Sequence, residues 1–309
     1  MGFQESALAA IGKTPLVALA RLYSGPGRLL AKLEFLQPGG SIKDRAALTC
    51  IRLAQTQGLL RPGTPVVEMT SGNMGSALAI VCNVYGHPFT AVMSAGNSPV
   101  RAAMMRGLGA DVVLVPQVDG HEGMVTGNDI AAASEEAKRI AERTGAFYVD
   151  QFRNPGTVLA HEEGTGPEIW NAVGGDIRAF VAAVGSGGTF VGTSRYLKER
   201  APNVRCIAVE PKDCEVLAGK KPLKPRHLLQ GTGYGFVPPQ WDPALVDDIV
   251  AVSDEEAAEM RHLLAKKEGL YVGLSSGANV SAALRVIRTM HPGPADSVVT
   301  VLCDTGLKY

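Results

Sequence analysis

Short apolar runs alternate along this chain with segments whose apolar residues recur at helical spacing. Runs of five or six mostly apolar residues predict strands at 64–69, 88–93, 111–115, 179–184, 205–210, 248–252 and 297–302. Residues 73–85 are predicted to form a helix, and Ser98-Pro99 predicts another helix start. Ser253 and Glu256 form a capping box that predicts a helix reaching Lys267. A helix face is also marked by Ile130, Ala133, Ala137, Ile140 and Ala141.

This alternation of strand and helix is typical of βαβ units, whose sheets are mostly parallel and carry helices on both faces. A chain of 309 residues is long enough for two such sheets. We therefore predict an α/β fold with two doubly wound sheet domains.

Charge and cysteine content narrow the possible partners. The 30 basic and 30 acidic side chains balance, which gives no signature of nucleic-acid or acidic-membrane binding. Residues 69–100 carry no charge, but Gly, Asn, Ser and Pro interrupt them too often for a membrane span. Five widely spaced cysteines without a C-x-x-C pair argue against a disulfide framework or a zinc site. With no signal peptide evident, we expect a cytoplasmic protein without a metal.

Glycine is in excess, with 36 residues where average usage of roughly 7% predicts about 22. Many of these glycines cluster where a predicted strand turns into a helix, which is where ligands bind in open α/β sheets. The clusters are at 39–40, 72–75, 185–189, 231–235 and 273–277.

The sequence Gly185-Ser-Gly-Gly-Thr189 directs backbone N–H groups and a helix N-terminus toward one anion-sized position. A dinucleotide fingerprint would need glycine in place of Phe190, although Glu210 stands where that motif has its acid. Gly12-Lys-Thr14 has the letters of a triphosphate loop, but Pro15 blocks the helix that must follow. A monophosphate fits best, and a tight turn without any ligand is the alternative.

Two further segments could take part in chemistry. Lys43 precedes an apolar helical pattern, and the positive end of a helix disfavours the ammonium form, as a Schiff-base lysine requires. Its alternative is a solvated surface lysine. Thr70-Ser-Gly-Asn73 gathers hydroxyl and N–H donors that could bind a carboxylate, or could only cap the following helix.

Taken together, these segments resemble the cysteine synthase family, which includes O-acetylserine sulfhydrylases and cystathionine β-synthases. The matching motifs, in order, are Ser41-Ile-Lys43-Asp-Arg45, Thr70-Ser-Gly-Asn73, Gly185-Ser-Gly-Gly-Thr189 and Gly273-Leu-Ser-Ser-Gly277. Gly12-Lys-Thr-Pro-Leu-Val17, Thr165-Gly-Pro-Glu-Ile-Trp170 and Asp304-Thr-Gly-Leu-Lys-Tyr309 match as well, so that the resemblance covers essentially the whole chain. The family consists of pyridoxal 5′-phosphate enzymes of the tryptophan synthase β-like fold.

The resemblance implies a role for each matched residue. Lys43 would form the internal aldimine and move the α-proton, Asn73 would hydrogen-bond the pyridine 3′-oxygen, and Ser275 would face the ring nitrogen. The cofactor phosphate would be bound by Gly185, Ser186, Gly187, Gly188 and Thr189. The amino-acid substrate would be bound by Thr70, Ser71, Gly72, Met74, Gln151 and Gly231.

The implied reaction is β-replacement on an activated L-serine through an aminoacrylate intermediate. A hydroxyl such as Ser275 leaves the ring nitrogen neutral, which favours departure of a β-substituent over a long-lived carbanion. O-acetyl-L-serine and sulfide giving L-cysteine is the leading reaction. Other nucleophiles or leaving groups, with homocysteine, cyanide, an amine or O-phosphoserine as reactants, are the alternative. A serine or threonine dehydratase or racemase is the third possibility.

Several departures from the family pattern bear on the substrates. Met74 stands where the family usually has Thr, and residues 94–99 and 231–235 differ from the commonest sulfide-using versions. Residues 116–128 resemble a longer loop. His121 and His161 could assist proton transfer, with surface or structural roles as the alternative. A phosphorylated substrate could be attracted by Lys220, Lys221, Lys224 and Arg226, which could equally be a solvated basic loop.

The resemblance also implies a division into domains with the cofactor in the cleft between them. A smaller, mobile substrate-carboxylate domain would comprise residues 1–12 and 37–154, and a larger cofactor-phosphate domain residues 13–36 and 155–309. A homodimer is implied, and a complex with a serine acetyltransferase is a further possible partnership.

Overall fold

The computed structural model describes residues 3–223 and 227–309, which form two compact units. The first unit comprises the described residues up to Gly12, together with Gln37–Thr157 and Lys308–Tyr309. The second unit comprises Lys13–Leu36 and Val158–Leu307, less the three residues outside the description. Each unit has its own sheet and its own apolar core.

The first unit is built on a four-stranded parallel sheet in the order β5-β4-β3-β6. Its strands are β3 (Val66–Met69), β4 (Phe89–Ser94), β5 (Asp111–Val115) and β6 (Phe147–Tyr148). Its helices are η1 (Ala7–Ala10), α1 (Lys43–Thr56), α2 (Asn73–Tyr85), α3 (Pro99–Gly107) and α4 (Gly127–Thr144). All four residues of β3 are buried, as expected for a central parallel strand covered on both faces.

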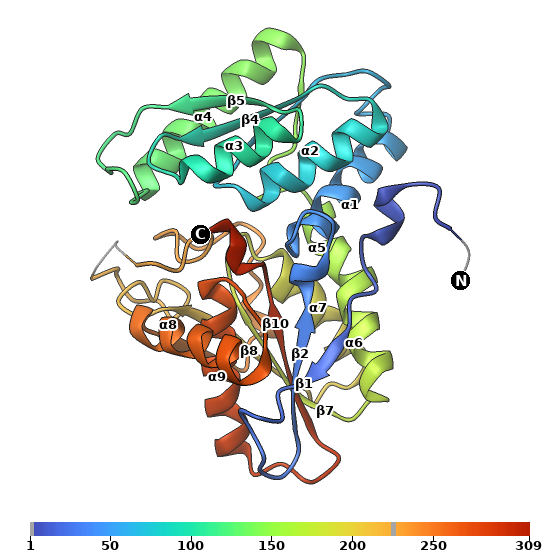
Figure 1. The fold of residues 1–309 in the computed structure, drawn as a ribbon, viewed down its shortest axis with the longest axis vertical. Coiled ribbons are helices and arrows are strands. Elements are labelled where there is room, and N and C mark those ends of the chain that lie inside the picture. Colours follow the sequence, from blue (N-terminus) through green and yellow to red (C-terminus); the bar gives the residue numbers. More distant parts are fainter. Residues whose placement is uncertain (1–2, 224–226) are drawn as a thin grey trace. The chain divides into compact units, whose positions relative to one another are not determined.

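The second unit is built on a six-stranded sheet in the order β1-β2-β10-β7-β8-β9, parallel except for β1. Its strands are β1 (Leu16–Ala18), β2 (Arg28–Leu33), β7 (Ile177–Ala183), β8 (Arg205–Pro211), β9 (Asp248–Val252) and β10 (Ser297–Leu302). Its main helices are α6 (Gly166–Val173), α7 (Gly188–Arg200), α8 (Asp254–Leu263) and α9 (Leu274–Met290). In Figure 1, α8 and α9 lie on one side of this sheet and α6 and α7 on the other.

Short helical segments complete the chain. They are η2 (Glu34–Leu36), α5 (Gly156–Ala160), the π-helical η3 (His161–Thr165) and η5 (Leu264–Glu268), η4 (Pro243–Leu245) and η6 (Gly306–Lys308). The prediction of an α/β chain with two mostly parallel sheets is confirmed, and each predicted strand is present within about two residues of its expected ends.

Helix ends show where local chemistry agreed with the prediction and where it did not. The Ser253–Glu256 capping box is present at the start of α8, but the last turn before Glu268 is π-helical rather than α-helical. Ser98 precedes α3 as expected, yet its side chain makes no capping hydrogen bond. The segment expected to be a loop to residue 128 ends earlier, because Thr126 and Asp129 form a capping box that starts α4.

Buried thiols fit the cysteine prediction. Cys50, Cys82, Cys206 and Cys214 are buried and unpaired, and Cys303 is half-buried. Among the described residues, no helix has the length and apolar character needed to cross a bilayer.

Candidate functional site

Lys43 is the first residue of α1, in the first unit, and its side chain is half-buried. The turn that leads to it is held by the Gly39 N–H, which donates to the Asp44 carboxylate. The Ser41 hydroxyl in this turn is buried without a hydrogen-bond partner among the described residues. Lys43 is therefore the first residue of a helix, and the turn before it is fixed by a hydrogen bond to the next residue, Asp44.

The Thr70–Met74 segment joins β3 to α2 in the same unit. Thr70 is buried, and its Oγ1 accepts hydrogen bonds from the N–H groups of Gly72 and Gly75, both at 3.0 Å. Gly72 has φ +139°, a conformation that other residues rarely adopt. Thr70 thus shapes the loop with its oxygen lone pairs, and its hydroxyl hydrogen remains as a donor.

Gln151 lies beside the end of β3, where this loop begins. Its backbone N–H donates to Glu68 Oε1 at 3.3 Å, and its Nε2 donates to the Met69 carbonyl at 3.0 Å. The structure therefore brings Gln151 to the loop, although about 80 residues separate them in the chain. The Met74 side chain is buried in the apolar core of the first unit.

The C-terminal residues complete this half of the candidate site. Lys308 Nζ donates to the Gly39 carbonyl at 2.6 Å and to Asn73 Oδ1 at 2.8 Å. One ammonium group thereby joins the turn before Lys43 to the start of α2. Arg101, on α3, donates from Nη1 to the Ser71 carbonyl at 3.0 Å. The sequence predicts no role for Lys308 or Arg101. Only the family match at Asp304-Thr-Gly-Leu-Lys-Tyr309 indicates that the C-terminal region is important.

Glu68 is a buried carboxyl next to the loop, and burial raises its pKa to about 8 from an ordinary 4.5. The Gln151 N–H opposes this shift only in part. Between pH 4.5 and 8 the folded state keeps a proton that the unfolded state has lost. The free energy of unfolding therefore falls as the pH rises through this window.

Glu68→Gln is expected to reduce the slope with which the free energy of unfolding falls with pH, by up to about 1.4 kcal/mol per pH unit. The amide keeps a carbonyl oxygen for the Gln151 N–H but cannot ionise. Urea unfolding at a series of pH values between 5 and 8 measures the effect. Glu142→Gln, at an exposed position of α4, is the control and should keep the wild-type slope. Equal slopes in both variants would show that Glu68 does not titrate in this window.

In the second unit, residues 185–189 connect β7 to α7. A Cβ atom at position 185 would overlap the carbonyl oxygen of Gly231, so that the two chain segments touch backbone to backbone. Gly187 precedes α7 with φ +98° and no side-chain cap, and Ser186 is buried. The first N–H groups of α7 are thus not satisfied by a capping side chain, which leaves a cradle suited to an anion. Gly231, predicted to line the substrate site, lies against this loop.

Ser275 is the second residue of α9 and is half-buried. The helix begins at Leu274, after the N-cap residue Gly273, which provides no side-chain cap. Its neighbour Ser276 is buried, and Ser276 Oγ accepts from the Cys303 N–H at 2.9 Å. The two serines therefore differ: Ser276 ties α9 to the end of β10, and Ser275 lies at the start of the helix with partial exposure.

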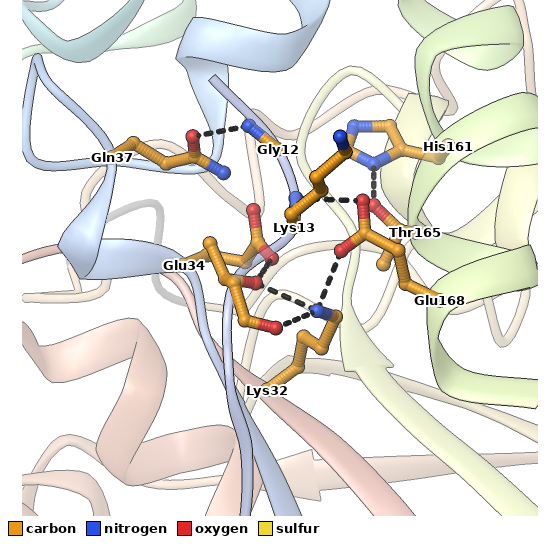
Figure 2. A network of polar contacts seen from close by, with 9 residues as sticks. Gly12, Lys13, Lys32, Glu34, Gln37, His161, Thr165 and Glu168 are labelled. Carbon is orange, nitrogen blue, oxygen red and sulfur yellow. Dashed lines mark hydrogen bonds and ion pairs between the residues drawn. The ribbon is translucent and has the colours of Figure 1, made fainter. Parts of the chain in front are cut away.

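Figure 2 shows polar contacts around His161 and around Lys32, two buried side chains of the second unit. His161 is buried, with Nδ1 2.9 Å from Thr165 Oγ1 and Nε2 3.2 Å from Thr189 Oγ1. On α6, Glu168 accepts a hydrogen bond from Lys32 Nζ at 2.6 Å. Lys32 also donates to Thr14 Oγ1 at 2.8 Å. The Gly12-Lys-Thr14 motif thus contributes Thr14 to the support of α6.

The other polar candidates lie apart from these contacts. His121 is exposed, and its Nδ1 contacts the carbonyl of the adjacent Glu122. Lys220 is exposed and pairs with Glu215 at 3.3 Å, and Lys221 is exposed. Lys224 and Arg226 lie outside the described residues. In the part of the chain that the structure describes, no group of His, Cys, Asp and Glu side chains is arranged to hold a metal ion.

Each unit, taken by itself, carries groups that suit one part of a phosphate-bearing aldehyde such as pyridoxal 5′-phosphate. The first unit has a half-buried lysine at a helix start, and the second has a glycine-rich strand–helix turn without a side-chain cap, which suits a phosphate. In the loop at 70–74, the Thr70 and Ser71 hydroxyls and the start of α2, which has no side-chain cap, provide donors that suit a carboxylate.

Comparisons with known proteins extend over nearly the whole chain. A family model described as pyridoxal-phosphate dependent enzyme matches residues 7–304. A cysteine synthase of Staphylococcus aureus (strain Mu50) is 38% identical over 301 residues, covering 97% of this chain and 93% of the relative. The structure of an O-ureido-L-serine synthase is 36% identical with a TM-score of 0.91, covering 100% of this chain and 94% of that one. That of an O-acetylserine dependent cystathionine β-synthase from Helicobacter pylori is also 36% identical, with a TM-score of 0.90 and coverages of 100% and 98%.

Proposed function

Because the chain belongs to the pyridoxal-phosphate dependent enzyme family, we propose that it carries out β-replacement on an activated L-serine. O-acetyl-L-serine and sulfide are the proposed substrates, and L-cysteine is the proposed product. Support comes from the cysteine synthase relative, which is similar over almost its full length.

One observation carries the proposal: the turn before Lys43 and the start of α2 share a single ammonium group. Lys308 Nζ is 2.6 Å from the Gly39 carbonyl and 2.8 Å from Asn73 Oδ1. The reactive amine and the loop that suits a carboxylate therefore belong to one connected structure within the first unit. An enzyme that binds an amino acid by its carboxylate and removes the proton from its α-carbon needs this proximity.

Each proposed role follows from the chemistry of the side chain. Bound pyridoxal phosphate supplies an electron-accepting ring that acidifies the α-proton of an amino acid and promotes loss of its β-substituent. Lys43 attaches the cofactor by its amine and then moves the α-proton. Asn73 would donate to the 3′-oxygen, and the Ser275 hydroxyl would face the ring nitrogen and leave it uncharged. The 185–189 backbone binds the phosphate.

The substrate carboxylate is assigned to the Thr70–Gly72 loop and Gln151. The Thr70 hydroxyl hydrogen, the Ser71 hydroxyl and the N–H groups at the start of α2 are all donors, as a carboxylate requires. The assignment is supported by similarity to a cysteine synthase that is 38% identical. The loop holds the amino acid and fixes the Cα–H bond for Lys43.

The purified, cofactor-loaded enzyme tests this function directly. Incubation with O-acetyl-L-serine and sulfide is expected to yield L-cysteine, measured by a thiol-specific derivative separated by chromatography. Omission of either substrate is the control. An enzyme that holds cofactor, consumes O-acetyl-L-serine and makes no cysteine would exclude sulfide as the nucleophile.

Two related structures support β-replacement with another nucleophile as a second candidate function. One is an O-ureido-L-serine synthase and the other an O-acetylserine dependent cystathionine β-synthase, and each is 36% identical to this chain. Their names indicate different products. A panel of sulfide, homocysteine, cyanide, hydroxyurea and a primary amine, each added with O-acetyl-L-serine, separates these reactions by product mass. O-phosphoserine in place of O-acetyl-L-serine tests the leaving group. Pyruvate or D-serine formed without any nucleophile would indicate a dehydratase or racemase.

A further inference from the structure

Lys308 is a buried lysine with two oxygen partners in the first unit. Its residue is 5% exposed, and its ammonium contacts the Gly39 carbonyl and Asn73 Oδ1. The chain leaves the second unit at Leu307, so that Lys308 and Tyr309 alone return to the first unit. A cation that is removed from water in this way needs strong acceptors.

The chemistry of an ammonium group fixes the orientation of the Asn73 amide. An ammonium carries three donors and no acceptor, whereas an amide has an oxygen that accepts and a nitrogen that donates. Asn73 must therefore turn Oδ1 toward Lys308, which makes Nδ2 the end of the amide directed elsewhere. A donor at Nδ2 is what a hydrogen bond to the 3′-oxygen of pyridoxal phosphate requires.

Tyr309 supports the same loop at a second point. The Arg101 guanidinium carbon lies 4.5 Å from the centroid of the Tyr309 ring, a cation–π contact. Arg101 is buried and donates to the Ser71 carbonyl, and its side chain covers Gly72, where a Cβ atom would come within 2.6 Å of Arg101 Cδ. The two C-terminal residues thus contact the loop region at Asn73 and, through Arg101, at Ser71 and Gly72.

We propose that Lys308 is a positioning residue, whose ammonium group holds the Asn73 amide with Nδ2 toward the cofactor 3′-oxygen. The proposal rests on the role given to Asn73 under the proposed function. In this proposal Lys308 acts through Asn73, the side chain that its ammonium contacts. Loss of Lys308 lets the amide rotate, which weakens the hydrogen bond that tunes the cofactor ring.

The test uses the cofactor-loaded enzyme with Lys308→Met, Lys308→Arg and the control Lys267→Met, at an exposed position. Lys308→Met is expected to retain cofactor but to change the ratio of its absorption bands, and to lower kcat/KM by about tenfold. Lys308→Arg keeps a cation that only donates and should restore both. Lys267→Met should resemble wild type. An unchanged spectrum and kcat/KM in Lys308→Met would overturn the proposal, as would a Lys308→Arg variant as impaired as Lys308→Met.

A double-mutant cycle separates this inference from the proposed function. If Lys308 acts through Asn73, Lys308→Met has little further effect on the spectrum in an Asn73→Ala background. Additive effects would overturn the proposal. An Asn73→Ala enzyme with a wild-type spectrum would overturn both the role of Asn73 and this inference, whereas an altered Asn73→Ala beside an unaltered Lys308→Met overturns the inference alone. Should Lys308→Met not fold, Lys308→Gln replaces it, because a glutamine amide both donates and accepts and so does not fix the orientation of Asn73.

Discussion

Lys43→Ala is expected to lower the rate of β-replacement by about 10²- to 10⁴-fold, because the variant loses the amine proposed to attach the cofactor and to move the α-proton. The other proposed cofactor contacts, at Asn73, residues 185–189 and Ser275, involve other parts of the chain. Lys43 is half-buried at the first position of α1, and alanine is a good helix former. The fold should therefore persist. Initial rates with O-acetyl-L-serine and sulfide, with circular dichroism as a check of the fold, measure the effect.

Lys267→Ala is the matched control for this experiment, since it removes an exposed lysine at the end of a helix in the second unit. It should retain wild-type activity. A Lys43→Ala enzyme with more than a few per cent of the wild-type rate would show that another group moves the α-proton. Loss of activity in both variants would point to a general effect of lysine removal.

Gly185→Ala is expected to weaken cofactor binding by roughly 100-fold, equivalent to about 3 kcal/mol. The added Cβ atom would overlap the Gly231 carbonyl oxygen. The backbone fixes the position of Cβ, and the oxygen is itself a backbone atom, so that no rotamer change relieves the clash. The loop must move, and the N–H groups at the start of α7 move with it. Equilibrium titration of the apoenzyme with pyridoxal phosphate, followed by absorbance, measures the affinity.

Gly107→Ala is the matched control, because it adds the same Cβ atom at a position where that atom meets no neighbour. Gly107 ends α3, and an added Cβ atom would meet nothing within 4 Å. Its effect on stability is expected to be neutral or favourable, by at most about 1 kcal/mol. Wild-type affinity in Gly185→Ala would mean that the 185–189 backbone does not bind the phosphate. Equal weakening in both variants would point to an indirect effect of either substitution.

Much of the fold follows from local sequence patterns, because buried parallel strands form short apolar runs. β5, β9 and β10 have the predicted limits, and α2 begins at Asn73 and ends at Tyr85 as expected. The short strands β1 and β6 were not predicted, since three and two residues hold too little pattern. The start of α4 was missed because the sequence was read as a loop through Asn128, although the Thr126–Asp129 capping box lies in it.

The candidate site was predicted less completely, for a different physical reason. Glycine clusters at strand–helix turns are local features, and the sequence alone therefore indicates residues 185–189. Contacts between distant segments leave no periodic pattern: Lys308 meets Asn73 across 235 positions of the chain. Arg101 contacts Ser71 from α3, the helix that follows strand β4. His161 contacts Thr189 from η3. Such supporting residues can be identified only from the folded structure, because the sequence carries no signal for contacts between distant segments.

Borohydride reduction of the cofactor-loaded enzyme, followed by peptide mass spectrometry, identifies the lysine that holds the cofactor. The reduced pyridoxyl group is expected on the peptide containing Lys43, and Lys308→Met should leave it there. A pyridoxyl group on Lys308, on Lys32 or on any other lysine would show that Lys43 does not carry the cofactor.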